Sequence, residues 1–145
     1  MSKKSSKASN VVTLNDENVQ SKEITVQDLI KSTSKKKDQK QSMEEFLQTV
    51  TVLSLNEKKY TSMNNINLCP NMQTLHLFQN YIIRIENLDN MIHLKILHLE
   101  YNRIEQIEGL DSLISLEKLY LSKNRIRRLE GLEGLVNLKD LVISN

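Results

Sequence analysis

Leucine and isoleucine recur at fixed positions through the second half of the chain, with polar residues between them. The pattern is clearest in three phrases, "LHLFQN" at 75–80, "LHLEYN" at 97–102 and "LYLSKN" at 119–124, which lie 22 residues apart. Alternation of apolar and polar residues over such a short run is typical of a β-strand with one buried side. A fixed period of this length indicates a stack of similar units. The sequence therefore predicts a solenoid rather than a domain closed around a single core.

The repeating unit keeps its apolar and asparagine positions through three copies. The copies that begin at 72 and 116 match the one that begins at 94, which contains Leu94, Leu97, Leu99, Asn102, Ile104, Ile107, Leu110 and Leu113. A less regular copy precedes them at 50–72 and a partial copy starts at Leu138, which gives about four and a half repeats of the leucine-rich type. We predict an α/β repeat fold: a leucine-rich-repeat solenoid with a concave parallel β-sheet and irregular or 3-10 returns on its convex side.

Three asparagines, Asn80, Asn102 and Asn124, occupy one position of the unit and are predicted to point inward. No neighbouring strand supplies backbone partners at this position, so we expect the asparagines to form a ladder of hydrogen bonds to adjacent turns. Gly109 and Gly131 stand where a return must bend. Glycine permits such a bend because it adopts backbone angles that other residues avoid.

The N-terminal part has a different character. Residues 1–42 carry nine lysines against five acidic residues, whereas 43–145 carry eleven basic residues against thirteen acidic ones. We predict a disordered basic leader over 1–41, with a short helix at 25–31. Ser42 and Glu45 have the spacing of a capping box, which predicts a helix over 42–49. This helix would cap a repeat domain that spans 42–145, because the first unit of a solenoid exposes its core.

The C-terminal end of the sequence, "LVISN", begins a strand and stops before the return that should follow it. A solenoid end without a polar cap exposes its core and a free strand edge. We therefore expect a longer form of the protein to carry at least one more repeat and a cap.

Composition narrows the cellular setting and the class of partner. The single cysteine, Cys69, excludes an internal disulfide and fits a reducing compartment. The sequence has no secretory signal, and no apolar run approaches the roughly 18 residues that a membrane span needs. The net charge of +2 does not provide the concentrated positive field of nucleic-acid binders. These features predict a cytoplasmic protein without membrane contact, whose partner is not a nucleic acid.

The sequence carries no recognisable catalytic constellation: no paired carboxylates, no glycine-rich phosphate loop and no nucleophile beside a base. His76 and His98 occupy equivalent positions on adjacent strands. Two imidazoles fall short of the three or four ligands that zinc usually takes. We therefore predict no enzyme activity, no cofactor and no metal site.

The concave face is the predicted binding surface. Exposed aromatic rings on a rigid sheet offer large contact area at a low cost in entropy. The predicted partner-binding residues are His76, Phe78, His98, Glu100, Tyr101 and Tyr120. Two other interpretations stay open: the rings could serve cross-strand packing alone, and an acidic partner could bind the convex arginines Arg125, Arg127 and Arg128 instead.

The 22-residue period, with "IENL" and "IEGL" in the returns, resembles the short class of leucine-rich repeats typified by regulators of protein phosphatase 1. The order of "ITVQDLIKS", a charged spacer and the repeats is similar to ciliary, centrosomal and axonemal members of that family. The resemblance implies a non-enzymatic adaptor at the cilium, centrosome or cytoskeleton. Its implied partners are axonemal or microtubule-associated proteins, or protein phosphatase 1.

Two points qualify this implication. The sequence lacks the basic–Val/Ile–x–Phe/Trp motif that docks on phosphatase 1, since neither Phe46 nor Phe78 has the preceding residues. Similar repeats also build a splicing-particle subunit that grips a small RNA-binding domain. A ribonucleoprotein adaptor is therefore the alternative function, and binding that depends steeply on salt would favour it.

Overall fold

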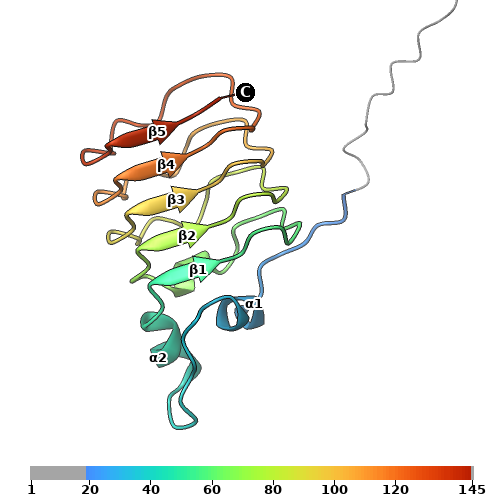
Figure 1. The fold of residues 1–145 in the computed structure, drawn as a ribbon, viewed down its shortest axis with the longest axis vertical. Helices are drawn as coiled ribbons and strands as arrows, with labels where there is room; N and C mark the ends of the chain where they lie inside the picture. Colours follow the sequence, from blue (N-terminus) through green and yellow to red (C-terminus); the bar gives the residue numbers. More distant parts are fainter. Residues whose placement is uncertain (1–18, 145) are drawn as a thin grey trace, which may run out of the picture.

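The protein's structure is a computed structural model that describes residues 19–144. Within this part, five strands form one parallel sheet in chain order (Figure 1). The strands are β1 (Val52–Ser54), β2 (Thr74–His76), β3 (Ile96–His98), β4 (Lys118–Tyr120) and β5 (Asp140–Val142). Each residue pairs with the residue 22 positions further on, as Leu75 does with Leu97. The predicted leucine-rich-repeat solenoid with a parallel sheet is confirmed.

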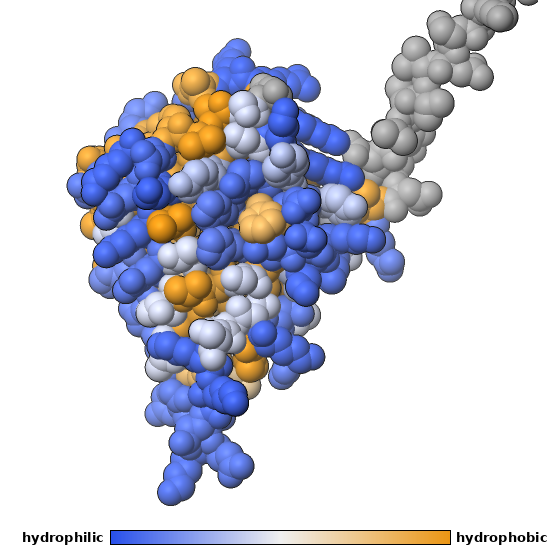
Figure 2. Space-filling model, in the orientation of Figure 1, coloured by the Kyte–Doolittle hydropathy of each residue, from blue (hydrophilic) through white to orange (hydrophobic). Residues whose placement is uncertain are grey.

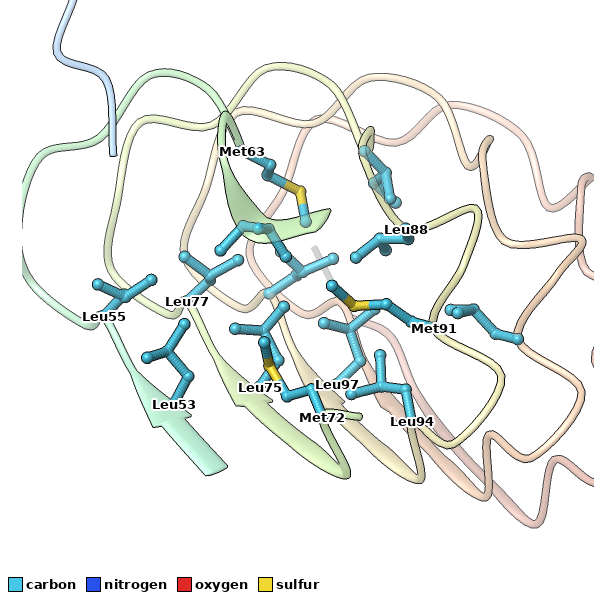
Figure 3. Close-up of a cluster of buried hydrophobic side chains, with 14 of the residues drawn as sticks. Leu53, Leu55, Met63, Met72, Leu75, Leu77, Leu88, Met91, Leu94 and Leu97 are labelled. Atoms are coloured by element: carbon cyan, nitrogen blue, oxygen red, sulfur yellow. The ribbon is translucent and has the colours of Figure 1, made fainter. Parts of the chain in front are cut away.

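The hydrophobic core lies between the sheet and the returns. The leucines at the centres of β1 to β4 have no exposed surface, and they meet buried side chains from the returns such as Met63, Leu88 and Met91 (Figure 3). Burial of a leucine stabilises a fold by about 1.5–3 kcal/mol. Because every turn contributes the same side chains, the core continues along the stack without a single centre.

Each return is built from two consecutive tight turns. In the return after β2, the Met91 N–H donates to the Leu88 carbonyl and the Leu94 N–H donates to the Met91 carbonyl, both at 3.0 Å. The same pair of bonds recurs 22 residues later, at Leu113 and Leu116. Among the described residues, only the first return contains a 3-10 helix, η2 (Ile66–Leu68). The convex side is otherwise irregular.

Gly109 and Gly131 have left-handed backbone angles, with φ of +69° and +73°. A Cβ at position 109 would lie 2.9 Å from the Ile85 carbonyl oxygen, and one at position 131 would overlap the Ile107 carbonyl. Glycine is therefore favoured at both positions for two reasons: it adopts the left-handed backbone of the bend, and it leaves room for the carbonyl of the preceding turn. Asn65 and Asn87 take the same position in the earlier repeats with φ of 66° and 63°, a conformation that asparagine tolerates better than most residues.

Two short helices cover the first repeat: α1 (Val26–Lys31) and α2 (Met43–Gln48). Each begins with a complete capping box, formed by Thr25 with Asp28 and by Ser42 with Glu45. Such boxes satisfy N–H groups that the first helical turn leaves without partners. Helix α2 buries Phe46 and Leu47 in the core, and both helices lie at the β1 end of the sheet (Figure 1).

The structure moves the predicted start of the folded unit. The sequence predicts a repeat domain at 42–145 and a leader at 1–41, but Ile24 and Leu29 are fully buried in the same core as the repeats. The Asn65 side-chain amide also donates to the Ile24 carbonyl at 2.7 Å. The segment around α1 therefore packs with the repeat domain, because its apolar side covers surface that the first repeat would otherwise expose. Residues 1–18 of the predicted leader lie outside the described residues.

The last described strand is the least covered. Leu141 at the centre of β5 is 37% exposed, whereas its partner Leu119 on β4 is fully buried. Hydrophobic side chains gather toward the β5 end of the face shown in Figure 2. Within residues 19–144, neither helix approaches the length and apolar content needed to cross a membrane.

Candidate protein-binding site on the concave face

The short strands present their first and third residues to the concave side of the sheet. In β2, β3 and β4 these residues are half-buried while the central leucine is fully buried. The spacing follows from the strand period of two, which sends neighbouring side chains to opposite faces. The concave face therefore carries columns of side chains, each column taking one residue from every repeat.

One column is a stack of aromatic rings. The rings of His76 and His98 have centroids 4.8 Å apart at 21° to one another, and those of His98 and Tyr120 lie 4.3 Å apart and nearly parallel at 1°. Parallel strands are about 4.8 Å apart, so flat rings in register meet face to face. The three rings form one ladder that crosses β2, β3 and β4.

Glu100 attaches to the middle of this ladder. Its Oε1 lies 2.9 Å from Nδ1 of His98, and both side chains are largely buried, with 20% and 23% of their surface exposed. Its other oxygen, Oε2, is buried and has no hydrogen-bond partner among the described residues. A carboxylate oxygen withdrawn from water without a partner is energetically unfavourable. Among the described residues, only one of the two carboxylate oxygens of Glu100 therefore has a hydrogen-bond partner, and the other is able to accept a hydrogen bond.

His76 forms the β2 end of the ladder and favours its neutral form. Burial lowers the pKa of His76 and the neighbouring His98 lowers it further, whereas Glu100 acts in the opposite direction. A neutral imidazole can both donate and accept a hydrogen bond. The ladder therefore presents rings and hydrogen-bonding ring edges at this end rather than a concentration of positive charge.

Phe78 and Tyr101 follow strands β2 and β3 in the chain and lie beyond their C-terminal ends. Tyr101 is 56% exposed and has a left-handed backbone with φ of 56°. Its N–H donates to the Ser122 carbonyl at 2.9 Å, which extends the pairing of neighbouring turns. Phe78 is half-buried, and its N–H donates to Oδ1 of Asn56 at 3.1 Å. A left-handed tyrosine is unfavourable by roughly 1–2 kcal/mol, so the ladder of backbone bonds, not local preference, fixes Tyr101 in place.

Asn80, Asn102 and Asn124 lie directly under this surface. In the middle repeat, Oδ1 of Asn102 accepts from the Ile82 N–H at 3.0 Å, and its amide donates to the carbonyls of Leu77 and Leu99 at 2.9 and 3.0 Å. Asn80 and Asn124 make the corresponding bonds in their own repeats. Each asparagine thus ties its own turn to the one before it, and the concave side chains stand on a rigid base.

Two ion pairs join β4 to β5, at and just before the first residues of these strands. Lys118 and Asp140 are 2.9 Å apart, and Lys139 and Glu117 are 2.7 Å apart. The hydrogen bond to Asp140 raises the pKa of Lys118. These pairs are exposed and contribute little to stability. They do mark the boundary of the aromatic site, which is confined to the surface over β2, β3 and β4.

The remaining candidates are Cys69, a metal cluster and the convex arginines. Burial raises the pKa of the Cys69 thiol to about 11, so it stays protonated and unreactive. No three His, Cys, Asp or Glu side chains between residues 19 and 144 are grouped as metal ligands. Arg127 and Arg128 are exposed and line a shallow cleft with Glu105 and Glu130.

The pairing of His98 with Glu100 was not predicted from the sequence, although both residues were assigned to the site. Their spacing of two residues on a strand is a signal for it, because i and i+2 share a face. The structure joins four of the six predicted residues: His76, His98 and Tyr120 stack on one another, and Glu100 contacts His98. Tyr101 follows Glu100 in the chain. Phe78 lies on the same side of the sheet, one strand away from Glu100.

Comparison with known proteins agrees with this architecture. The family model for leucine-rich repeats in two copies matches residues 70–112 and 114–145. Among solved structures, an internalin (inlF) from Listeria monocytogenes is similar at 30% identity with a TM-score of 0.62. The alignment covers 69% of this chain and 31% of that one, so the chain spans about a third of the internalin's length.

Two further solved complexes are also similar. The Drosophila melanogaster SNF/U2A' complex matches at 29% identity with a TM-score of 0.52, covering 63% of this chain and 59% of that one. The TLR13–ssRNA13 complex matches at 29% identity with a TM-score of 0.54, covering 63% of this chain and 14% of that one. No curated protein matches the sequence.

Proposed function

The chain belongs to the leucine-rich repeat family, and we propose that it is a non-enzymatic scaffold that binds a protein partner through its concave face. The family fold is typical of interaction scaffolds, and curved solenoids generally bind on their concave surface. We place the scaffold at ciliary, cytoskeletal or phosphatase-containing assemblies in the cytoplasm, on the strength of the sequence resemblance to regulators of protein phosphatase 1.

The aromatic ladder is the observation that carries the proposal. His76, His98 and Tyr120 stack over three strands, and Tyr101 exposes 56% of its surface beside them. Tyrosine is enriched among residues that dominate binding energy, because its ring offers large area with few rotatable bonds. The core leucines lie on the other side of the sheet, so these rings are not needed to close the core.

The proposed partners are axonemal or microtubule-associated proteins, or protein phosphatase 1. Because the sequence lacks the short phosphatase-docking motif, a complex with the phosphatase would have to use the concave face. The same variants of the concave face can therefore test binding to both classes of partner, the cytoskeletal proteins and protein phosphatase 1.

The experiment replaces Phe78, His98, Tyr101 and Tyr120 together by alanine. We expect the variant to keep its repeat fold and to lose capture of purified phosphatase 1 catalytic subunit or of microtubules, whichever the wild-type chain binds. The matched control reverses the charges of Arg125, Arg127 and Arg128 on the loops. Capture that survives the alanine variant and is destroyed by the arginine reversals would overturn the concave site.

A ribonucleoprotein adaptor is the second candidate, supported by the similarity to U2A' in its complex with SNF. In that role the concave face would hold a small RNA-binding domain. Purified partner and RNA, titrated against the chain at increasing salt, separate the two functions. Steep loss of RNA co-binding with salt supports the adaptor, and salt-tolerant binding to a cytoskeletal or phosphatase partner supports the scaffold.

A further inference from the structure

A column of exposed apolar side chains lies on the turns that lead into strands β3, β4 and β5. Ile92 is 46% exposed, and the residues one and two repeats later, Ile114 and Val136, are 49% and 75% exposed. Each is the second residue of the tight turn that ends a return, such as the turn closed by the Leu94 N–H and the Met91 carbonyl. The turns lie along one edge of the sheet (Figure 1). These three residues, the apolar edge column, are therefore outside the concave site.

The local chemistry of the turns does not explain the apolar edge column. Tight turns favour proline, aspartate, asparagine, serine and glycine, and Pro70 occupies this position in the first repeat. Isoleucine and valine are favoured in strands instead, where their branched side chains pack against neighbours. A single exposed apolar residue is ordinary, but a contiguous apolar patch marks a surface that binds something. The next question is therefore whether the three side chains are contiguous.

Successive turns of this edge are in direct contact. The Asn137 side-chain amide donates to the Ile114 carbonyl at 2.6 Å. A Cβ at Gly134 would lie only 2.9 Å from the Cα of Asp111, one repeat earlier. The turns are therefore stacked as closely as the strands, which are about 4.8 Å apart, and the apolar edge column forms a strip about 10 Å long.

A column of carboxylates accompanies this strip. Asp89, Asp111 and Glu133 precede the apolar residues by three positions, each as the second residue of the preceding tight turn. All three are exposed, and within residues 19–144 none of them pairs with a basic side chain. The opposite flank has mixed charge, since Lys139 pairs there with Glu117 at 2.7 Å. The edge therefore offers an apolar strip with negative charge along one side.

We propose that this edge binds a basic amphipathic helix of a protein partner, with the helix axis along the stack of repeats. On one face of an α-helix, residues at i, i+3 or i+4 and i+7 are about 5–6 Å apart, which matches the spacing of the repeats. Residues on one face of an extended peptide are about 7 Å apart and do not match it. Lysine or arginine beside the apolar residues of the helix would lie against the carboxylate column. The same carboxylates disfavour an acidic helix and an anionic membrane surface.

The edge surface does not depend on the function proposed for the concave face. The aromatic ladder crosses the strands β2, β3 and β4, whereas the apolar edge column lies on the turns that precede β3, β4 and β5. A chain with both surfaces can hold one partner in the concavity and another along its edge.

The test titrates the 15N-labelled full chain with a synthetic helical peptide of about 18 residues, long enough to form a helix. The peptide carries leucine at i, i+4 and i+7 and lysine beside these positions. We expect the amide shifts of the chain to change only in 89–93, 111–115 and 133–137. A peptide with glutamate in place of lysine should not bind at the same concentrations.

Two variants separate the contributions of apolar contact and charge. The first replaces the apolar edge column by serine, with Ile92→Ser, Ile114→Ser and Val136→Ser. It should weaken binding of the lysine peptide by at least about tenfold, because apolar anchors dominate binding energy. The second reverses the carboxylate column, with Asp89→Lys, Asp111→Lys and Glu133→Lys. It should also weaken binding of the lysine peptide and transfer the preference to the glutamate peptide.

The charge-matched control reverses three exposed acidic residues elsewhere, with Glu57→Lys, Glu105→Lys and Glu130→Lys. It should keep the wild-type affinity for the lysine peptide, and a thermal melt should show that all three variants remain folded. The proposal is overturned if the wild-type chain does not bind the lysine peptide at millimolar concentration, or binds both peptides equally. Amide shifts elsewhere on the chain, or an equal loss of affinity in the control, would overturn it as well.

Discussion

The two ends of the stack contain the same repeat pattern but differ in how far their apolar side chains are buried. Leu53 on β1 is fully buried, whereas Leu141 at the equivalent position on β5 is 37% exposed. The returns show a larger contrast, since Ile107 is 3% exposed and Leu129, one repeat later, is 65% exposed. The burial of a leucine in this fold therefore depends on the turn that lies beyond it, not on its own turn.

Helices α1 and α2 provide that outer layer for the first repeat. Tyr60 is 1% exposed, and the Asp28 carboxylate of α1 lies close enough to help raise the pKa of its hydroxyl. The contact joins residues far apart in sequence, and it encloses the first repeat as a neighbouring turn would. Four predictions test how far stability follows from this difference between the ends.

The largest expected effect is a comparison of Leu97→Ala with Leu141→Ala. Truncation of a fully buried leucine costs about 2–5 kcal/mol, because it leaves a cavity as well as losing apolar contact. Leu141 is 37% exposed, so its truncation should cost less, about 1–2 kcal/mol. Urea unfolding of both variants provides the measurement. Equal losses would show that the β5 end is as well covered as the centre.

The second comparison concerns the asparagine ladder. Asn102→Ala should cost roughly 1–3 kcal/mol, because it leaves buried backbone groups without partners. Asn124→Ala should cost less, since Asn124 is half-buried and water can replace part of its bonds. The concave variant Tyr120→Ala is the reference and should be milder than Asn102→Ala in a thermal melt. A melt unchanged by Asn102→Ala beside a large fall for Tyr120→Ala would contradict the register.

The third prediction concerns pH and the capped end. Burial raises the pKa of Tyr60 to about 12, assisted by the charge of Asp28 and its hydrogen bond. The folded pKa lies above the ordinary value of 10.0, so this contribution is complete below pH 10 and is lost as pH rises toward 12.

We expect the wild-type chain to lose more stability than Tyr60→Phe over that alkaline range, when both are followed by urea unfolding at fixed pH. Burial acts to raise the pKa of Asp28, but hydrogen bonds from Thr25 and Tyr60 outweigh it and lower the pKa overall. The Asp28 contribution is therefore present above its unfolded pKa and lost as pH falls through the folded value. Parallel alkaline profiles for the two chains would contradict the proposed role of the Tyr60 hydroxyl.

The smallest expected effect is at Leu129, the position equivalent to the buried Ile107. Leu129→Ser should change the free energy of unfolding by no more than about 0.5 kcal/mol, as is usual for exposed sites. Thermal unfolding of the variant beside the wild type tests it. A clear loss of stability would mean that another part of the protein covers this side chain in solution.

The sequence alone was sufficient for the fold because its repeat places each side chain by local geometry. The 22-residue period predicted one short strand in each repeat, and the structure has these strands at Thr74–His76, Ile96–His98 and Lys118–Tyr120. The glycines at 109 and 131 marked the bends. The candidate concave residues could also be named, because alternation along a strand determines which face each one occupies. None of these inferences required knowledge of contacts between distant segments.

The sequence did not predict the groove beside Tyr81, which is lined by Val19 and by loops of successive repeats, because this groove depends on a contact between segments that are far apart in the chain. It needs the segment at Val19 to lie against loops more than sixty residues away, and no local pattern predicts that contact. One position of the repeat is occupied by Lys59, Tyr81, Arg103 and Arg125. Aligning the repeats would therefore have revealed the cluster of positive charge, but not the N-terminal segment beside it.

The sequence by itself determined the repeat register, the core leucines and the inward asparagines, because a strict period repeats one local geometry in every turn. The tertiary structure alone decided that α1 belongs to the repeat domain, that Glu100 meets the imidazole of His98, and that Leu129 is exposed while Ile107 is buried. Those outcomes depend on which turn or helix lies beyond a side chain. The physical reason is that burial and pairing are properties of two packed segments, whereas periodicity describes only one.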